Sequence, residues 1–111
     1  VNVGDRVFYA LNKSSLSSGA RTTLEKQAAW LKKYGGVKVT IEGHADERGT
    51  REYNLALGER RANSAKDFLV ALGVSPNRVK TISYGKERPV ALGHDESSWS
   101  QNRRGVTTVA R

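Results

Sequence analysis

The fold of this chain is decided by residues 37–49, which read VKVTIEGHADERG. Apolar and polar residues alternate from Val37 to Glu42, which predicts a strand with one buried face and one wetter face. Glycines at positions 43 and 49 bound a loop that holds Asp46. A helical pattern follows directly, so the stretch predicts a strand, a loop and a helix, with an acidic residue just past the strand.

The helix predicted after this loop carries a cation on its apolar side. Between residues 52 and 72 the apolar side chains recur at three- and four-residue steps. At about 100° per residue, Arg61 falls within roughly 20° of the centre of this stripe, Asn54 falls close to it, and Arg60 points toward solvent. The apolar members of the stripe are Leu57, Ala65, Phe68, Leu69 and Leu72.

A charged side chain in a core-facing stripe is costly unless it has a partner. Two interpretations of Arg61 follow from this rule. Either it forms an internal salt bridge to Asp46 or Glu42, or Arg61 and Asp46 both contact a ligand.

The rest of the chain predicts three further strands and one further helix. A helix that ends near Tyr34 is defined by Ala20, Leu24, Ala28 and Leu31, and Trp30 is predicted to make a flank contact beside that stripe. The further strands are predicted at residues 7–9, 79–84 and 105–110, with a long polar loop over residues 86–100. The order β-α-β-α-β-β over residues 1–111 predicts one α/β domain, a two-layer sandwich with two main helices on one face of a mixed sheet. The last strand is expected to pair antiparallel.

Composition limits the kinds of protein that this chain can be. Its 111 residues are enough for one domain with a single core. It contains no Cys, which excludes disulfides and thiolate metal sites, and it has no stretch of membrane-spanning length and hydrophobicity. It also contains no Met, so we expect it to be a fragment of a longer product.

The formal net charge of +8 suits a polyanionic partner such as nucleic acid. The 19 basic residues are dispersed, however, and the pairs Arg60-Arg61 and Arg103-Arg104 are not interleaved with aromatic residues that stack on bases. Dispersed basic residues indicate a solvated surface, so we predict that nucleic acid is not a partner.

Several short motifs occur in one order along almost the whole chain. They are Ile41-Glu42-Gly43-His44-Ala45-Asp46 with Gly49, Asn54 and Leu57 with Arg61-Ala62, Tyr84-Gly85 before Pro89, and Asn102-Arg103-Arg104. In this order and at these spacings the chain resembles the peptidoglycan-binding domain shared by OmpA-like outer-membrane proteins. Residues 43–50 and 92–96 are similar to the lipoprotein branch of that family, which works with the Tol system.

The resemblance implies a domain on the periplasmic side of the outer membrane of a Gram-negative bacterium, anchored by an upstream lipidated cysteine. It implies non-catalytic binding of peptidoglycan, without a cofactor or metal, through the diaminopimelate of the stem peptide. The β-propeller protein of the Tol system is a further implied partner. Asp46 suits the ammonium of diaminopimelate, and Arg61 suits its carboxylate through paired hydrogen bonds. The implied binding residues are Asp46, Arg61, Asn54, Leu57, Ala10 and Tyr9, with His44, Asn102 and Arg104 supporting the cleft.

The chain departs from the family pattern after its first strand. It reads Tyr9-Ala10-Leu11-Asn12 where the family usually has an acidic or glycine-containing stretch. The change matters little if the family uses the main chain there, and it removes a contact if the family uses a side-chain carboxylate. Asn54 is predicted to brace the loop before the helix.

Other kinds of chemistry have weaker support in the sequence. His44 and His94 show no repeated metal-ligand spacing, which favours a histidine that braces the loop. A glycosidase needs a pair of carboxylates, which could come from Glu42, Asp46 and Glu47. We predict instead that Glu42 and Glu47 are solvated charges. The alternatives to a binding module are therefore an enzyme that cleaves the cell wall and a basic module that binds polyanions.

Overall fold

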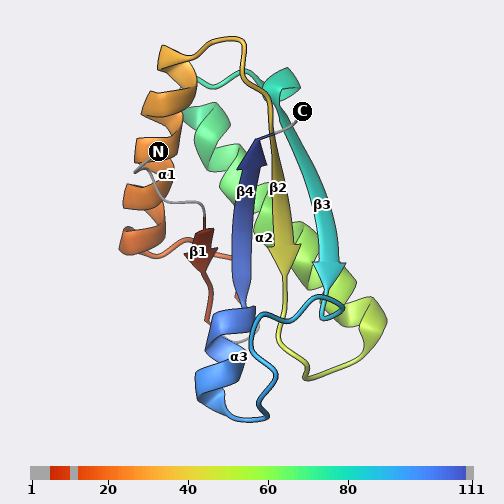
Figure 1. Ribbon diagram of the computed structural model, residues 1–111. Coiled ribbons are helices and arrows are strands. Elements are labelled where there is room, and N and C mark those ends of the chain that lie inside the picture. The colour runs from red at the N-terminus through yellow and green to blue at the C-terminus, as the bar shows by residue number, and fades with distance from the viewer. Residues whose placement is uncertain (1–5, 11–12, 110–111) are drawn as a thin grey trace.

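A computed structural model describes residues 6–10 and 13–109 and contains a single four-stranded sheet (Figure 1). The strands lie in the order β1-β4-β2-β3. Their bounds are β1 Arg6–Phe8, β2 Val39–His44, β3 Val79–Gly85 and β4 Arg104–Val109. The helices are α1 Ser18–Lys33, α2 Arg51–Ala71, the short 3-10 helix η1 Pro76–Arg78 and α3 Glu96–Asn102.

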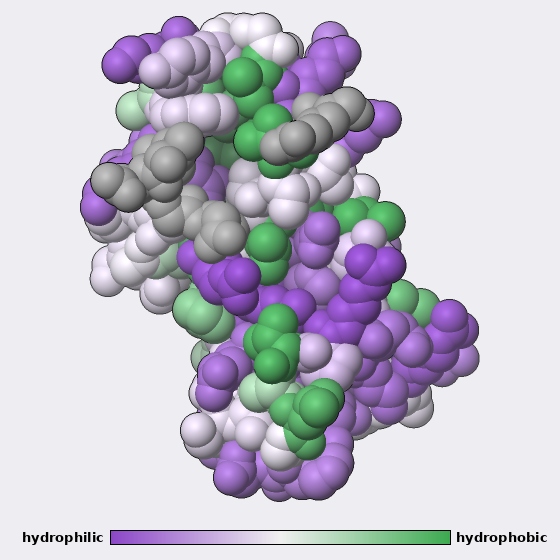
Figure 2. Space-filling view, viewed as in Figure 1, coloured by the Kyte–Doolittle hydropathy of each residue, from purple (hydrophilic) through white to green (hydrophobic). Residues whose placement is uncertain are grey.

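The sheet is mixed, and its helices leave one face uncovered. Strand β2 pairs parallel with β3, while β4 pairs antiparallel with both β1 and β2. Helices α1 and α2 lie on the same side of the sheet, so the two-layer α/β sandwich and the antiparallel last strand predicted from the sequence are confirmed. Figure 2 looks onto the uncovered face, where hydrophilic side chains surround a few hydrophobic ones.

Local signals set the ends of the helices. Ser17 caps α1 by accepting a hydrogen bond from the Ala20 N–H at 3.1 Å, and Thr50 caps α2 in the same way from the Tyr53 N–H at 3.1 Å. Helix α2 ends before Gly73, whose φ of 102° lies in the left-handed region that glycine adopts without strain. The caps fix where each apolar stripe begins, and thus which side chains face the sheet.

The core lies between the sheet and the two long helices. Ile41 of β2 and Leu69 of α2 are fully enclosed, and Leu24 and Leu31 of α1 are nearly so. Trp30 is half-buried against this core and contacts the Tyr34 ring at 5.2 Å between centroids, as the predicted flank contact requires.

The prediction of a structureless polar loop over residues 86–100 is wrong at its carboxyl end. Residues Glu96–Asn102 form α3, whose cap Asp95 accepts a hydrogen bond from the Ser98 N–H at 3.0 Å. The helix has 7 residues, too few for an apolar period to stand out in the sequence. It packs at the end of the sheet where β2 ends, which matters for the site.

The backbones of β2 and α2 touch at a pair of glycines. A Cβ atom built on Gly43 would lie 1.6 Å from the carbonyl oxygen of Gly58, and one built on Gly58 would lie 2.8 Å from the carbonyl oxygen of Gly43. Only glycine permits this approach at both positions. The contact presses the carboxyl end of β2 against α2, close to Arg61 in the next turn.

We expect Gly43→Ala to destabilise the fold, because its methyl group collides with backbone that cannot rotate away. Overpacking of this kind costs about 1–3 kcal/mol or more. Gly35→Ala is the matched control, since a Cβ there meets nothing within 4 Å. Urea unfolding measures both; equal free energies of unfolding for the two variants would contradict the close packing of β2 on α2.

Candidate functional site

The site is built around Asp46, which lies just past the end of β2. Only 4% of this residue is exposed, and its carboxylate is surrounded by cations. Arg48 donates from Nε to Oδ1 at 3.2 Å, from Nη2 to Oδ2 at 2.7 Å, and from its backbone N–H to Oδ1 at 3.0 Å. The third cationic contact comes from Arg103, whose Nη1 lies 3.2 Å from Oδ2.

Arg103 is the fixed cation of this cluster. Its Nε donates to the Tyr9 carbonyl at 2.8 Å, and its Nη2 donates to the Glu96 carboxylate at 2.6 Å. Tyr9 returns a hydrogen bond from its N–H to the Arg103 carbonyl at 3.0 Å. The arginine thereby joins β1, α3 and the Asp46 loop at one end of the sheet.

These contacts control the charge of Asp46. Burial by itself would raise the pKa of the Asp46 carboxyl, but the hydrogen bonds from Arg48 and Arg103 outweigh it and hold that pKa below its usual value. Asp46 is therefore ionised at neutral pH and offers an anion to whatever occupies the site.

Arg61 is fully buried and is held by carbonyl oxygens. Its Nη1 donates to the His44 carbonyl at 2.8 Å, its Nε to the Lys13 carbonyl at 2.8 Å, and its Nη2 to the Ala10 carbonyl at 3.0 Å. The Tyr9 hydroxyl donates to the Arg61 carbonyl at 2.9 Å, and the Tyr9 ring lies 5.2 Å from the guanidinium carbon. Arg61 thus ties α2 to the end of β2 and to the segment between β1 and α1.

The internal salt bridge proposed for Arg61 is not what the structure contains. Among residues 6–10 and 13–109, Asp46 pairs with Arg48 and Arg103, Glu42 pairs with His44, and no carboxylate pairs with Arg61. Burial lowers the pKa of Arg61 to about 10, although the nearby Tyr9 and Asp46 oppose this shift. Arg61 therefore stays charged at neutral pH, with its charge held by carbonyl dipoles.

The other residues predicted to bind ligand differ in their burial and in their contacts near Asp46 and Arg61. Asn54 braces the loop as expected, because its side-chain amide donates to the Arg48 carbonyl at 2.7 Å and to the Thr50 carbonyl at 2.9 Å. Leu57 is buried, and Ala10 is exposed beside the Arg61 guanidinium. Leu11 and Asn12, where the sequence departs from the family pattern, lie outside the described residues.

His44 supports the end of β2. Its Nε2 lies 3.1 Å from the Glu42 carboxylate, and its ring stacks on Tyr84 at 5.4 Å between centroids. Burial, together with the charges of Arg104 and Arg88, lowers the pKa of His44 despite the contact with Glu42. The described part of the chain holds no cluster of three His, Cys, Asp or Glu side chains that could bind a metal ion.

Asn102 and Arg104 hold the loop that precedes α3. The Asn102 side chain accepts from the N–H groups of Val90 and Ala91 at 2.8 and 3.0 Å and donates to the Ala91 carbonyl at 2.9 Å. Arg104 donates to the Arg88 carbonyl at 2.9 Å. Both side chains are buried and bond to backbone, so they fix the course of this loop; their support of a ligand cleft stays a prediction.

Glu47 is exposed, as predicted for a solvated charge, but it also has partners on other segments. Its carboxylate accepts from the Trp99 indole N–H and contacts His94 Nδ1 at 2.7 Å, which ties the Asp46 loop to α3. Trp99 lies on the short helix that the sequence did not reveal, so this partner was not foreseeable.

Arg48 and Arg103 are the site residues that the sequence prediction missed. Arg103 was part of the quoted motif Asn102-Arg103-Arg104, for which the resemblance suggested a structural or cleft-edge role, but it was not named as a contact of Asp46. A signal existed for Arg48, because an arginine placed directly after an Asp-Glu pair in a tight loop can fold back onto the first carboxylate.

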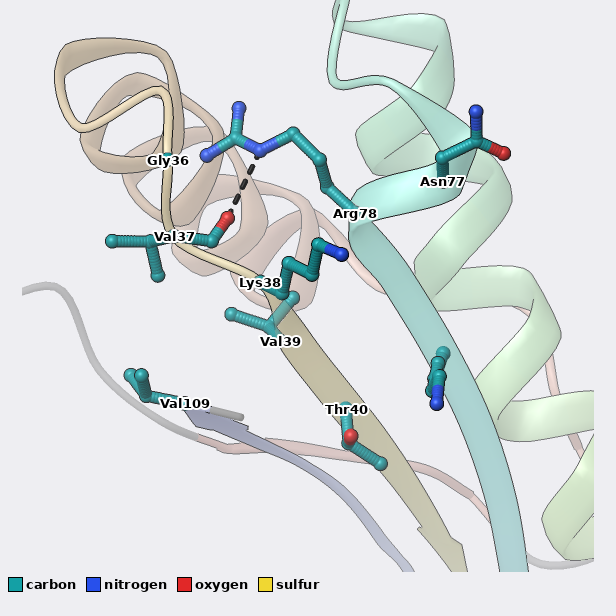
Figure 3. Close-up of a pocket in the computed structure, with 9 residues that line it drawn as sticks. Gly36, Val37, Lys38, Val39, Thr40, Asn77, Arg78 and Val109 are labelled. Carbon is teal, nitrogen blue, oxygen red and sulfur yellow. Dashed lines mark hydrogen bonds between the residues drawn. The ribbon is translucent and has the colours of Figure 1, made fainter. Parts of the chain in front are cut away.

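A separate hollow of about 550 Å³ lies at the opposite end of the sheet (Figure 3). It is lined by the starts of β2 and β3 and the end of β4, including Lys38, Thr40, Lys80 and Val109. Arg78 borders it but uses its guanidinium on the carbonyls of Val37, Leu31 and Tyr34, where it closes the end of α1. This hollow is distant from Asp46 and has no carboxylate in its lining.

Comparison with known protein families matches residues 8–103 to the OmpA family. The chain belongs to the OmpA family. This OmpA-family chain is 62% identical over 110 residues to the peptidoglycan-associated lipoprotein of Mesorhizobium japonicum, and 55% identical over 97 residues to that of Pseudomonas aeruginosa. The matches cover 99% and 87% of this chain but 66% and 57% of those relatives. The chain therefore spans less than two thirds of the length of these curated relatives.

Solved structures support the same family. The OmpA-family chain has a TM-score of 0.94 and 41% identity to the crystal structure of the peptidoglycan-associated lipoprotein from Burkholderia pseudomallei, covering 96% of this chain and 91% of that one. The C-terminal domain of Helicobacter pylori MotB shares the fold with a TM-score of 0.88 at 20% identity, covering 96% of this chain and 84% of that one. Within the described residues, no helix combines the length and hydrophobicity that crossing a membrane requires.

We expect Asp46→Asn to change how stability depends on pH. Because the folded-state pKa of Asp46 is depressed, its ionised form stabilises the fold above the unfolded value of about 3.9, and this stabilisation is lost as pH falls through the folded-state pKa. The difference in free energy of unfolding between wild type and Asp46→Asn should thus be constant above about pH 5 and shrink below about pH 4.

Urea unfolding from pH 3 to pH 7 measures this difference. Asp67→Asn, on the exposed side of α2, is the control and should stay close to wild type throughout. A difference for Asp46→Asn that does not shrink in acid would mean that the arginine contacts do not stabilise the ionised carboxylate.

Proposed function

We propose that this domain binds peptidoglycan without cleaving it, through the diaminopimelate of the stem peptide, and so ties the outer membrane to the cell wall. Relatives that are 62% and 55% identical to it are named peptidoglycan-associated lipoproteins, which supports the polymer as the ligand. We place the domain on the periplasmic side of the outer membrane in a Gram-negative cell, attached through a lipid anchor outside this chain. The β-propeller protein of the Tol system is a further partner in this proposal.

The observation that carries the proposal is a buried pair of opposite charges that do not neutralise each other directly. Asp46 supplies an ionised carboxylate that is 4% exposed, and Arg61 supplies a guanidinium that no described carboxylate pairs with. The end of diaminopimelate carries an ammonium and a carboxylate on one carbon. Such a zwitterion can pair with both groups, its ammonium with Asp46 in exchange for an arginine contact and its carboxylate with Arg61.

Binding of this kind requires the chain between β1 and α1 to adjust. Arg61 is enclosed, and two of its carbonyl partners, Ala10 and Lys13, belong to that connection. A ligand carboxylate reaches the guanidinium by replacing one of these carbonyls. The exchange is favourable because a carboxylate forms stronger, charge-assisted bonds with arginine than a neutral carbonyl does.

The ligand itself provides the first test. A stem tripeptide that contains diaminopimelate should bind at least about tenfold more tightly than one that contains lysine, because lysine lacks the terminal carboxylate and cannot form the charge-assisted bonds to Arg61. Isothermal titration calorimetry with the two peptides measures this ratio. Equal affinities would overturn the proposed ligand.

The same preparation separates a binding module from a cell-wall enzyme. When purified peptidoglycan is incubated with the domain and sedimented, the domain should sediment with it up to a saturating amount. The supernatant should contain no soluble peptidoglycan fragments after many hours. Release of fragments that grows with protein concentration would support the enzyme instead.

Two adjacent arginines test the assignment of Arg61. Arg60 and Arg61 carry the same charge, but only Arg61 is buried beside the site. Long-range attraction of the ligand should therefore depend equally on both residues, whereas direct contact with the ligand should depend on Arg61 alone. Arg61→Lys keeps the charge and loses the fork of donors, and it should weaken binding of the diaminopimelate peptide at least about tenfold. Arg60→Ala should stay within about threefold of wild type, since exposed charges contribute little.

Thermal unfolding must accompany these titrations, because Arg61 also joins three segments of the fold. Arg61→Lys is chosen over Arg61→Ala since lysine can still donate to one of the carbonyls. If the folded Arg61→Lys variant binds as wild type does, Arg61 is scaffolding alone and the carboxylate of the ligand is bound elsewhere.

A further inference from the structure

Arg48 occupies the place where a ligand ammonium would meet Asp46. Its Nη2 lies 2.7 Å from Oδ2 and its Nε lies 3.2 Å from Oδ1, so the guanidinium covers both carboxylate oxygens. Arg103 takes a further position on Oδ2. A carboxylate bound by two arginines has little room for a third cation, so one of these two contacts must open before an ammonium can bind.

The two arginines differ in how firmly they are held. The Arg103 side chain is 7% exposed and is also bonded to the Tyr9 carbonyl and to Glu96. The Arg48 side chain is 33% exposed, and its other side-chain contacts are the face of the Trp99 ring at 4.0 Å and a Glu96 oxygen 3.9 Å from Nη2. Arg48 is the cation that can leave, and Glu96 is an alternative partner already beside it.

The Arg48 side chain can move away from Asp46 without disturbing the loop, because the loop is held by hydrogen bonds to the main chain of Arg48. The Arg48 N–H donates to Asp46 Oδ1 at 3.0 Å, and the Arg48 carbonyl accepts from the Asn54 side chain at 2.7 Å. Neither bond involves the guanidinium. Rotation of the side chain away from Asp46 therefore keeps the backbone of the site in place.

We propose that Arg48 is an internal competitor that closes the ammonium subsite of the empty domain and is displaced when the ligand binds. This inference rests on the proposed function, since it concerns the regulation of the same site. The empty domain keeps Asp46 neutralised, and the ligand ammonium takes over from the guanidinium, which stays near Trp99 and Glu96. The apparent association constant then equals the intrinsic one multiplied by the fraction of empty domains in which Arg48 does not contact Asp46.

An internal competitor has a kinetic signature that a structural residue lacks. Its contact with Asp46 exists in the empty state and not in the bound state, so its removal should speed association and leave dissociation unchanged. It should also tighten the binding of every ligand that uses the ammonium subsite by the same factor, because the competition is independent of the rest of the ligand.

The test compares Arg48→Met with Arg51→Met. Both variants lose one positive charge, but Arg51 is exposed and pairs with Glu87 outside the site. For the diaminopimelate tripeptide we expect Arg48→Met to raise the association rate constant about fivefold, as expected for loss of a partly exposed ion pair, with dissociation within about twofold of wild type. Arg51→Met should match wild type in both rates.

The affinity for the lysine tripeptide should rise by the same factor when Arg48 is changed to Met. Stopped-flow fluorescence of a dye-labelled tripeptide gives both rate constants for wild type and for the two variants, and calorimetry gives the affinities.

The outcomes separate this inference from the function on which it rests. Wild type that binds neither tripeptide overturns both. Wild type that prefers the diaminopimelate peptide, together with Arg48→Met that binds it equally or more weakly, leaves the function in place and overturns the competitor. A gain that appears as slower dissociation also overturns it. Should Arg48→Met fail to fold, Arg48→Gln replaces it and is held to the same expectations.

Discussion

One buried guanidinium holds the functional end of this domain together. Arg61 bonds to the carbonyls of His44, Ala10 and Lys13, which belong to the end of β2 and to the connection between β1 and α1. These bonds are possible because Gly43 and Gly58 let β2 and α2 approach until their backbones touch. A charge in such a place is stabilised by oriented dipoles, and the loop that carries Asp46 is positioned as a result.

The sequence was most informative where a repeating pattern extended over many residues. Alternation located β2, the three- and four-residue period located α2, and the period alone placed Arg61 inside and Arg60 outside, as the structure has them. The order of these elements predicted the two-layer sandwich, and the motifs of the family added the residues expected to form the site. Helix α3 was missed because 7 residues are too few to display a period.

The partner of Asp46 could not be predicted in the same way. Helical geometry predicted that Arg61 faces the core but not how far it lies from Asp46. Arg48, Arg61 and Arg103 could each have paired with the Asp46 carboxylate. Arg48 wins through a tight local turn, and Arg103 reaches Asp46 across 57 positions of sequence because β4 brings it there. Outcomes of that kind depend on tertiary packing, which local patterns do not contain.

The order of the strands has a consequence for how the domain is made. Strand β4, at residues 104–109, lies between β1 and β2, which precede it in the chain. While the chain is being synthesised, β1 has no neighbour to pair with and one side of β2 stays open until this last strand emerges. Contacts of such long sequence separation slow folding and leave strand edges exposed in the meantime. Folding therefore gains if the nascent chain is kept unfolded, or bound to a chaperone, until residues 104–109 are available.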